Sequence, residues 1–210
     1  MEFSEYPISE FLTALASKDA VPGGGGASAL TAALGAALGN MVGNLTVGKE
    51  AYKDAEADLY CLMNETAQIQ KELTALIQKD ADGFAPLAAA YKMDKDDPNY
   101  DSVMEQCLRD AAAAPMEVLR LSCRMIELHS AYAKKGSALA ASDAATGAVL
   151  CWAAMYGAAV NVVVNTRLMR DRDYARRMNA EVDKLMNKYW KLAESTFDSV
   201  YRQLKKERKK

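Results

Sequence analysis

The chain has 210 residues, half of them hydrophobic, and a formal net charge of −2. This length fits one large domain or two small ones with a sizeable core, and the charge excludes a nucleic-acid binder that relies on bulk charge. A single histidine excludes zinc sites built from several histidines. The four cysteines form no CxxC pair, which predicts reduced thiols in a cytoplasmic protein, and the acidic N-terminus does not resemble a signal peptide.

Helical patterns dominate the chain from its beginning, and no segment alternates in the manner of a strand. Ser9 is a candidate cap for a first helix that ends near residue 19. A second helix is predicted over 27–47. Its glycines recur at every fourth position from Gly35 to Gly43, which leaves one face open to the close approach of another helix.

A third helix is predicted over 50–90, with apolar residues stepping by three and four from Leu59 to Leu76. The next position on this apolar face is Asp80, whereas Asp82 should face elsewhere. Burial would raise the pKa of Asp80 towards the range of a working acid or base. The structural alternative is an ion pair between Asp80 and a Lys or Arg of a neighbouring helix.

Three more helices complete the pattern. The fourth covers 101–134 and contains Pro115, which predicts a kink or a split, and the fifth covers 138–169. The sixth begins at 171 and ends in a basic run, which is either a solvated helix end or an attraction for an anionic ligand tail. We predict an all-α, single-domain bundle of about six long helices with no sheet over residues 1–210.

Two nearly uncharged segments, 27–47 and 144–160, have the length to be considered as membrane spans. Both are built largely from Ala and Gly and carry polar groups at their ends, so we favour buried central helices.

Polar residues also mark the fifth helix. Asp143 and Asn161 lie 18 residues apart, close to five full turns, and Asn165 is one turn further on. The small residues between them, which include Gly147 and Gly157, indicate either the floor of a groove or close helix packing, and we favour packing.

Two further features are weak on their own. The glycine run Gly23–Gly26 precedes the second helix and could present free N–H groups to an anion, but it fits neither a P-loop nor a dinucleotide fingerprint. His129 has no partner that the sequence identifies, which favours a satisfied or surface histidine over a catalyst.

Taken together, the motifs resemble those of the formiminotetrahydrofolate cyclodeaminase and methenyltetrahydrofolate cyclohydrolase family, in order and at compatible spacing over essentially the whole chain. Segments Pro22–Leu30 and Gly35–Lys49 are similar to its opening motif, and Asp80–Phe84, Gly136–Asp143 and Val160–Asp171 are similar to the next three. The resemblance implies an all-helical fold, a homodimer, a folate groove near the subunit interface and a catalytic acidic residue at Asp80.

The motifs and the resemblance together define a candidate site without a metal or a tightly bound cofactor. Asp80 and Asp143 are the candidate catalytic residues, and Lys49 is expected to bind an anionic part of the folate. The candidate substrate-binding residues are Gly23, Gly24, Gly25, Gly26, Lys49, Ser142, Asn161 and Asn165. Many members of the family have Ser at the position of Gly26 and Asn at the position of Ser137, so these two positions depart from the family pattern.

The activity that we expect is that of a methenyltetrahydrofolate cyclohydrolase, which hydrolyses a C–N bond of the one-carbon bridge to give formyltetrahydrofolate. The alternatives are a formiminotetrahydrofolate cyclodeaminase, which releases ammonia and forms methenyltetrahydrofolate, and a non-catalytic helical folate-binding or scaffold protein. Expected partners are a tetrahydrofolate derivative, polyglutamylated or not, a second copy of the chain, and a separate formiminotransferase or dehydrogenase. We expect neither nucleic acid nor a membrane as a partner.

Overall fold

A computed structural model describes residues 1–206 of the protein. Its α-helices are α1 (Ile8–Leu15), α2 (Gly24–Asn44), α3 (Glu56–Ala90), α4 (Tyr100–Lys135), α5 (Ala141–Thr166) and α6 (Arg172–Leu204). Short 3-10 helices cover Phe3–Glu5, Glu50–Ala55 and Ala138–Ala140, and residues 1–206 contain no strand. The predicted all-α bundle is confirmed, although α1 is short and only the other five helices are long. Residues 207–210, the end of the predicted basic tail, lie outside the described part.

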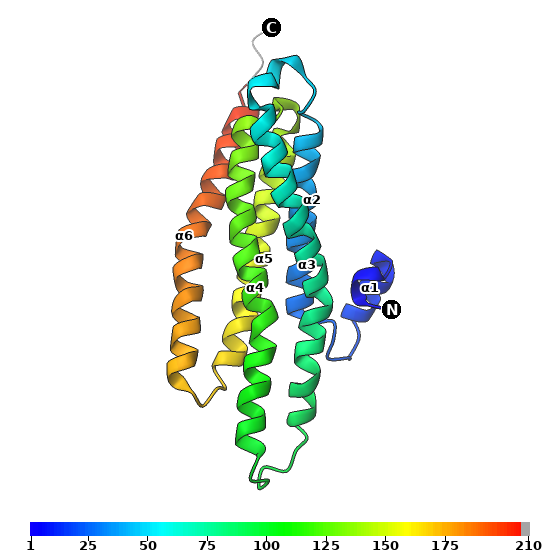
Figure 1. Ribbon diagram of the computed structural model, residues 1–210, viewed down its shortest axis with the longest axis vertical. Coiled ribbons are helices and arrows are strands. Elements are labelled where there is room, and N and C mark those ends of the chain that lie inside the picture. Colours follow the sequence, from blue (N-terminus) through cyan, green and yellow to red (C-terminus); the bar gives the residue numbers. More distant parts are fainter. Residues whose placement is uncertain (207–210) are drawn as a thin grey trace.

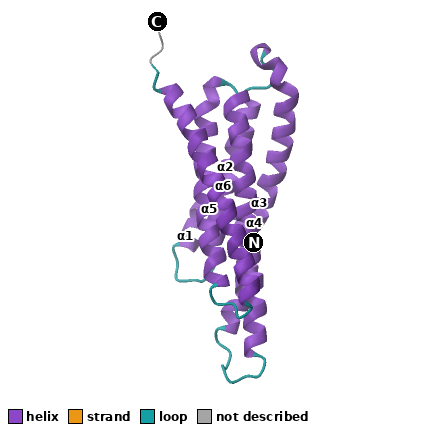
Figure 2. Ribbon diagram, turned by 90° about the vertical axis from the view of Figure 1, so that its left-hand side faces the viewer, coloured by secondary structure: helices purple, strands orange, loops and turns teal. Residues whose placement is uncertain are grey.

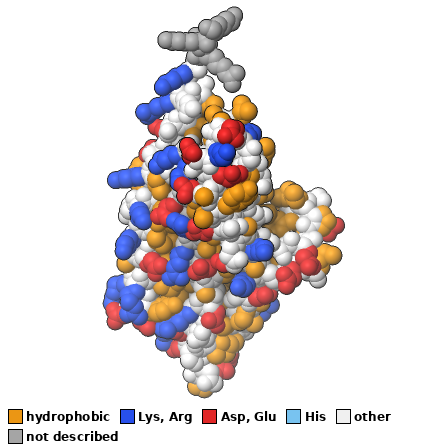
Figure 3. Space-filling model, turned by 45° about the horizontal axis from the view of Figure 1, so that its top comes forward, with side chains coloured by type: hydrophobic (Ala, Val, Ile, Leu, Met, Phe, Trp, Pro, Cys, Tyr) orange, Lys and Arg blue, Asp and Glu red, His pale blue; other side chains and the backbone are white. Residues whose placement is uncertain are grey.

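The five long helices run side by side along the length of the molecule (Figures 1 and 2), and α1 stands beside them. Figure 3 shows this N-terminal part as a lobe on one side of the bundle. Its Phe11 is buried, whereas Ile8 and Leu12 on the same short helix are exposed. The backbone N–H of Phe3 donates to Gln78 Oε1 at 2.9 Å, which ties the start of the chain to α3.

At the centre of the bundle, α2 and α5 lie against each other and run in opposite directions, since Gly24 lies beside Asn161 and Gly35 beside Cys151. A Cβ atom on Gly35 would overlap Cys151 Sγ and reach 3.1 Å from the carbonyl oxygen of Gly147. The predicted close approach to the glycine face of α2 is therefore confirmed, and α5 is one of the helices that make it.

The small residues of α5 serve the same purpose. A Cβ atom on Gly147 would overlap the ring of His129, and one on Gly157 would overlap Ser28 Oγ. Ala154 between them is also buried. Close packing, rather than the floor of a groove, accounts for the middle of this helix.

By length and composition, two segments are long and apolar enough to cross a membrane, Gly24–Asn44 and Ala138–Thr166, and 56% and 44% of their apolar windows are buried inside the bundle. These are α2 and α5, the helices that the sequence assigns to the buried centre. Their apolar character supplies the core of the bundle, which contains Ala29, Ala32, Ala144 and Ala158.

The cap predicted at Ser9 and the split that was one of two outcomes predicted for Pro115 were wrong. Ser9 does not cap α1, because that helix already begins at Ile8 after Pro7. Pro115 does not split α4, which continues from Tyr100 to Lys135. A proline inside a helix removes one backbone hydrogen bond and frees the carbonyl group four residues earlier, and in this structure that carbonyl group has another use, described below.

His129 is completely buried between α2 and α5. Its Nε2 atom donates to the carbonyl oxygen of Gly35 at 3.0 Å, while Nδ1 has no partner among the described residues. Burial lowers the pKa of His129 from 6.5 to about 4, although the hydrogen bond to Gly35 opposes this effect. The histidine is therefore neutral in the folded protein over most of the pH range and forms part of the core.

This burial predicts a loss of stability in acid. As the pH falls from about 6.5 to 4, the unfolded chain binds a proton at His129 before the folded protein does, so the free energy of unfolding should fall by up to about 3 kcal/mol. Thermal melts of the wild type and His129→Gln over this range would measure the effect. The wild type should be the more stable near neutral pH, and its advantage should shrink in acid. An advantage that does not change with pH would contradict the prediction.

Candidate active site

The site begins at the N-terminus of α2. This helix starts at Gly24, three residues earlier than predicted, so the glycine run forms its first turn and Gly23 is the N-cap residue. The first N–H groups of a helix have no acceptor within the helix itself. One of them, the N–H of Gly26, donates to Asp80 Oδ2 of α3 at 2.8 Å. The anion at this helix end is thus a side chain of the protein.

Asp80 is partly buried against α2, in keeping with its place on the apolar face of the third helix. Burial raises the pKa of its carboxyl group, and the hydrogen bond from Gly26 lowers it to a smaller extent. Among the described residues, no Lys or Arg forms an ion pair with Asp80, so the structural alternative of an ion pair is wrong. Asp82 is exposed and accepts a hydrogen bond from Gln78 at 2.8 Å, which confirms that it faces elsewhere.

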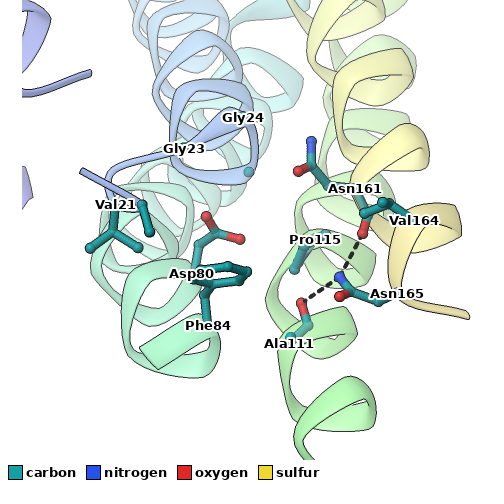
Figure 4. A pocket seen from close by; sticks show the side chains of 12 residues that line it. Val21, Gly23, Gly24, Asp80, Phe84, Ala111, Pro115, Asn161, Val164 and Asn165 are labelled. Atoms are coloured by element: carbon teal, nitrogen blue, oxygen red, sulfur yellow. Dashed lines mark hydrogen bonds between the residues drawn. The ribbon is translucent and has the colours of Figure 1, made fainter. Parts of the chain in front are cut away.

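A cavity of about 150 Å³ opens in front of Asp80. Figure 4 shows Asp80 and Phe84 of α3 on one side of it and Asn161 and Asn165 of α5 on the other. Gly23–Gly25 and Val21 close the end formed by the loop before α2. Asp80 and Phe84 are four residues apart on α3 and therefore share one face of that helix.

The two asparagines on the opposite side are held by their amide nitrogens. Nδ2 of Asn161 donates to the carbonyl oxygen of Gly157 at 2.8 Å. Nδ2 of Asn165 donates to the carbonyl oxygens of Asn161 at 2.8 Å and Ala111 at 3.4 Å. These bonds use both N–H donors of Asn165 and one of the two of Asn161, so the amide oxygens and the second N–H of Asn161 are the groups left for a ligand.

Pro115 explains why the carbonyl group of Ala111 is free to accept this bond. Ala111 lies four residues before Pro115, which has no N–H to donate to it. Both residues line the cavity (Figure 4). Sequence reasoning treated Pro115 only as a helix breaker and did not include Phe84 in the site. A proline on a helix that otherwise continues is the signal that could have indicated a free carbonyl group nearby.

The side-chain oxygens of Asp80, Asn161 and Asn165 are hydrogen-bond acceptors, and the first N–H groups of α2, at Gly24 and Gly25, are donors on the same cavity. The carboxylate has no cation beside it, so a ligand that carries N–H groups or a positive charge can bind next to Asp80. Burial raises the pKa of the Asp80 carboxyl group, and this direction favours its use as a group that accepts and returns a proton.

Three predicted site residues lie elsewhere. Asp143 and Ser142 are in the first turn of α5, about 27 Å along the helix axis from Asn161. Lys49 follows the C-terminal end of α2, whereas the cavity lies at its N-terminal end. A single chain therefore brings together Gly23–Gly26, Asp80, Asn161 and Asn165, but not Lys49, Ser142 or Asp143.

The two departures from the family pattern also fall at opposite ends of the bundle. Gly26 donates its backbone N–H to Asp80, and this contact does not depend on which side chain stands at the position. Ser137 is buried far from the cavity, and its N–H donates to Thr46 Oγ1 at 2.8 Å.

The glycine run generates a test of the site. A Cβ atom on Gly25 would overlap the Asp80 carboxylate, whereas one on Gly23 would reach only the carbonyl oxygen of Ala20, at 3.5 Å. We expect Gly25→Ala to displace Asp80 and to lower activity by ~10²-fold or more, and Gly23→Ala to stay close to the wild type. The turnover rates of the two variants are compared with that of the wild type, and circular dichroism checks that each variant is folded. Equal activities of the two variants would contradict this account of Gly25.

Comparison with known proteins gives the site a context. Residues 7–184 match the family described as formiminotransferase-cyclodeaminase. A methenyltetrahydrofolate cyclohydrolase of Methylorubrum extorquens is 33% identical over 197 residues, which cover 92% of this chain and 95% of that protein. A formimidoyltransferase-cyclodeaminase of Gallus gallus is 29% identical over 86% of this chain, which spans only 34% of that longer protein.

A solved structure shares the fold. The crystal structure of a formiminotetrahydrofolate cyclodeaminase from Thermotoga maritima superposes with a TM-score of 0.84 at 25% sequence identity, and the match covers 95% of this chain and 100% of that one. With the family match over residues 7–184, this agreement in fold and sequence shows that the chain belongs to the formiminotransferase-cyclodeaminase family.

Proposed function

We propose that the protein is a methenyltetrahydrofolate cyclohydrolase. The observation that carries the proposal is the partly buried carboxylate of Asp80, which has no ion-pair partner among the described residues and faces a cavity lined by the amide oxygens of Asn161 and Asn165. Methenyltetrahydrofolate is a cation, in which a one-carbon bridge joins two nitrogens of the folate. The likeness to the cyclohydrolase of Methylorubrum extorquens over nearly its whole length supports the same reaction.

Asp80 supplies the acid–base chemistry in this proposal. Its carboxylate stabilises the cationic carbon and accepts a proton from the attacking water, whose oxygen forms the new C–O bond. One C–N bond of the bridge then breaks, and the leaving nitrogen receives the proton from Asp80. The hydroxyl proton of the intermediate leaves to solvent as the formyl group forms. The raised pKa of Asp80 brings both proton transfers closer to neutral pH.

The amide oxygens of Asn161 and Asn165 have a positioning role in the proposal. They accept N–H groups of the bicyclic ring and hold the bridge carbon opposite Asp80, across the cavity. Asn165 is itself oriented by the carbonyl group that Pro115 leaves free. This orientation precedes ligand binding, so little ordering of the site is needed when the ligand enters.

A formiminotetrahydrofolate cyclodeaminase is the second candidate. The observation in its favour is the fold shared with the Thermotoga maritima protein of that name, over the full length of that chain. In that reaction a folate nitrogen attacks the formimino carbon and ammonia leaves, and Asp80 would donate the proton to the leaving group. The relatives are named as enzymes, which favours either reaction over a non-catalytic folate-binding or scaffold protein.

Neither reaction requires a metal or a bound cofactor, because water, the folate and one acid–base group complete the balance of atoms. We place the protein in the cytoplasm, in keeping with the free thiols of Cys61, Cys107, Cys123 and Cys151. The fused relatives, of which this chain matches about a third, support a separate formiminotransferase as a functional partner. A dehydrogenase partner remains an expectation from the chemistry of the substrate.

A homodimer is the assembly that the family resemblance implies. The glycine faces of α2 and α5 are filled within the chain, so they do not support a dimer. Another stripe of α2 does, because Leu34, Met41 and Leu45 are 43–50% exposed and lie on one side of the helix. We infer a homodimer through this stripe. A second copy would also offer a route by which Lys49 or Asp143 of one subunit could serve the site of the other.

The proposed reaction predicts the behaviour of a variant at Asp80. Asp80→Asn keeps an acceptor for the N–H of Gly26 but cannot exchange a proton, so turnover should fall by ~10²-fold or more. Because burial raises the pKa of Asp80, the wild type loses stability as the pH rises from the unfolded pKa through the folded pKa, whereas the variant does not, so the variant should melt at or above the wild-type temperature at neutral pH. Asp82→Asn, on the exposed side of α3, is the control.

Absorbance of the methenyl chromophore measures the outcome. Loss of the signal from methenyltetrahydrofolate identifies the hydrolase, and its appearance from formiminotetrahydrofolate together with ammonia identifies the deaminase. Tight binding without either change would support a non-catalytic protein. An Asp80→Asn variant with full activity would overturn the role of Asp80.

The inferred homodimer predicts the effect of a charge on the exposed stripe. Met41→Glu places a charge in the middle of the exposed stripe of α2, so the dimer dissociation constant should rise by ~10-fold or more. Leu12→Glu, on the exposed side of α1, is the control and should leave the mass unchanged. Light scattering at micromolar concentration gives the mass of each variant. A monomeric wild type would contradict the inferred homodimer.

A further inference from the structure

The cavity in front of Asp80 is too small for a whole folate. Its volume of about 150 Å³ is below the range of about 300–1,000 Å³ that is usual for ligand pockets. A tetrahydrofolate consists of a bicyclic ring, an aminobenzoyl ring and a glutamate with two carboxylates. If the bicyclic ring lies in the cavity, the remainder must continue along a neighbouring surface.

One surface continues directly from the cavity. A groove of about 410 Å³ lies between α5 and α6, and Val164 lines both the groove and the cavity. Along α5 the groove is formed by Tyr156, Val160 and Val163, which are 40–68% exposed. Val182 and Met186 of α6 form the opposite side. The groove therefore has the apolar character that an aromatic ring requires.

The groove also contains a cation. Arg167 lines it and lies one helical turn beyond Val163 and Val164 on the same face of α5. Neighbouring arginines are engaged, since Arg170 pairs with Asp101 and Arg109 with Asp171, whereas the Arg167 guanidinium has no ion-pair partner among the described residues. An arginine fork matches the geometry of a carboxylate.

One acidic residue, Asp183 of α6, also lines the groove and is exposed. It would repel a carboxylate placed beside it, so the charges assign an orientation to the ligand. The glutamate end of the folate is placed next to Arg167, two residues after Asn165 of the cavity. The aminobenzoyl ring is placed against Val160, Val163 and Val164.

We propose that this groove is the subsite for the aminobenzoyl-glutamate part of the folate and that Arg167 binds its glutamate carboxylate. The proposal rests on the proposed function, since it takes the folate from that site. It also supplies the cation that Lys49, at the other end of α2, cannot supply within one chain.

The test compares two substrates that differ only in the glutamate. These are methenyltetrahydrofolate and methenyltetrahydropteroate, which ends at the benzoate ring. Arg167→Gln should raise the KM of the first by ~10-fold and leave its kcat unchanged, because the lost contact is remote from the reacting carbon. The KM of the second should change much less. Arg167→Lys keeps the charge and should recover part of the affinity.

Arg170→Gln is the matched control, because it removes an arginine three residues away whose ion pair with Asp101 lies outside the groove. It should leave both KM values as they are. Equal effects of Arg167→Gln on the two substrates, or no effect on either, would overturn the proposal.

Calorimetric titration with tetrahydrofolate and tetrahydropteroate keeps the subsite separable from the reaction. If the wild type turns over neither methenyl nor formimino substrate, the proposed function fails, and the affinities still decide the role of Arg167. A loss of tetrahydrofolate affinity in Arg167→Gln with unchanged affinity for tetrahydropteroate supports the subsite. Turnover by the wild type without this selectivity rejects the subsite alone.

Discussion

The hydrogen bond from Gly26 to Asp80 is the contact on which the rest of the site depends. It joins the first turn of α2 to α3 and places a carboxylate at the positive end of a helix. Burial and the helix end act on this carboxylate in opposite directions, and burial has the larger effect on its pKa. The bond therefore positions the side chain without removing its capacity to take up a proton.

Small residues make this arrangement possible. A side chain at Gly25 would occupy the space of the carboxylate, one at Gly35 would separate α2 from α5, and one at Gly147 would displace His129 of α4 from α5. Because α2 and α5 run in opposite directions and pack closely, the start of α2 meets the end of α5. This packing brings the asparagines of α5 to the site, so the position of the cavity depends on the packing of the core.

The sequence predicted the elements of the site that follow a helical period. Asp80 interrupts an apolar pattern, and Asn161 and Asn165 stand one turn apart, so their sharing of a helix face could be worked out. The bundle itself follows from the same periodicity. The start of α2 was predicted three residues late, because the glycines that begin it favour no helix on their own.

Other features of the site could be found only from the three-dimensional structure. Asp143 and Lys49 lie far from Asp80 within one chain because the start of α5 and the end of α2 are at the opposite end of the bundle. The periodicity of the sequence does not predict which helix ends lie together. The bond between Asn165 and the carbonyl group of Ala111 joins two helices. The prediction that His129 is a satisfied or surface histidine is correct in part. The residue is buried, its Nε2 forms a hydrogen bond, and its Nδ1 has no partner among the described residues.

The carboxylate in the cavity has a consequence for the end of the proposed catalytic cycle. In the proposed reaction Asp80 faces a cationic substrate, but the formyl compound that hydrolysis yields has lost the positive charge of the bridge. Asp80 is ionised again once the leaving nitrogen has taken its proton, and it then holds the uncharged product less firmly than the substrate. Charge neutralisation in the reaction would promote product release, without any movement of the helices.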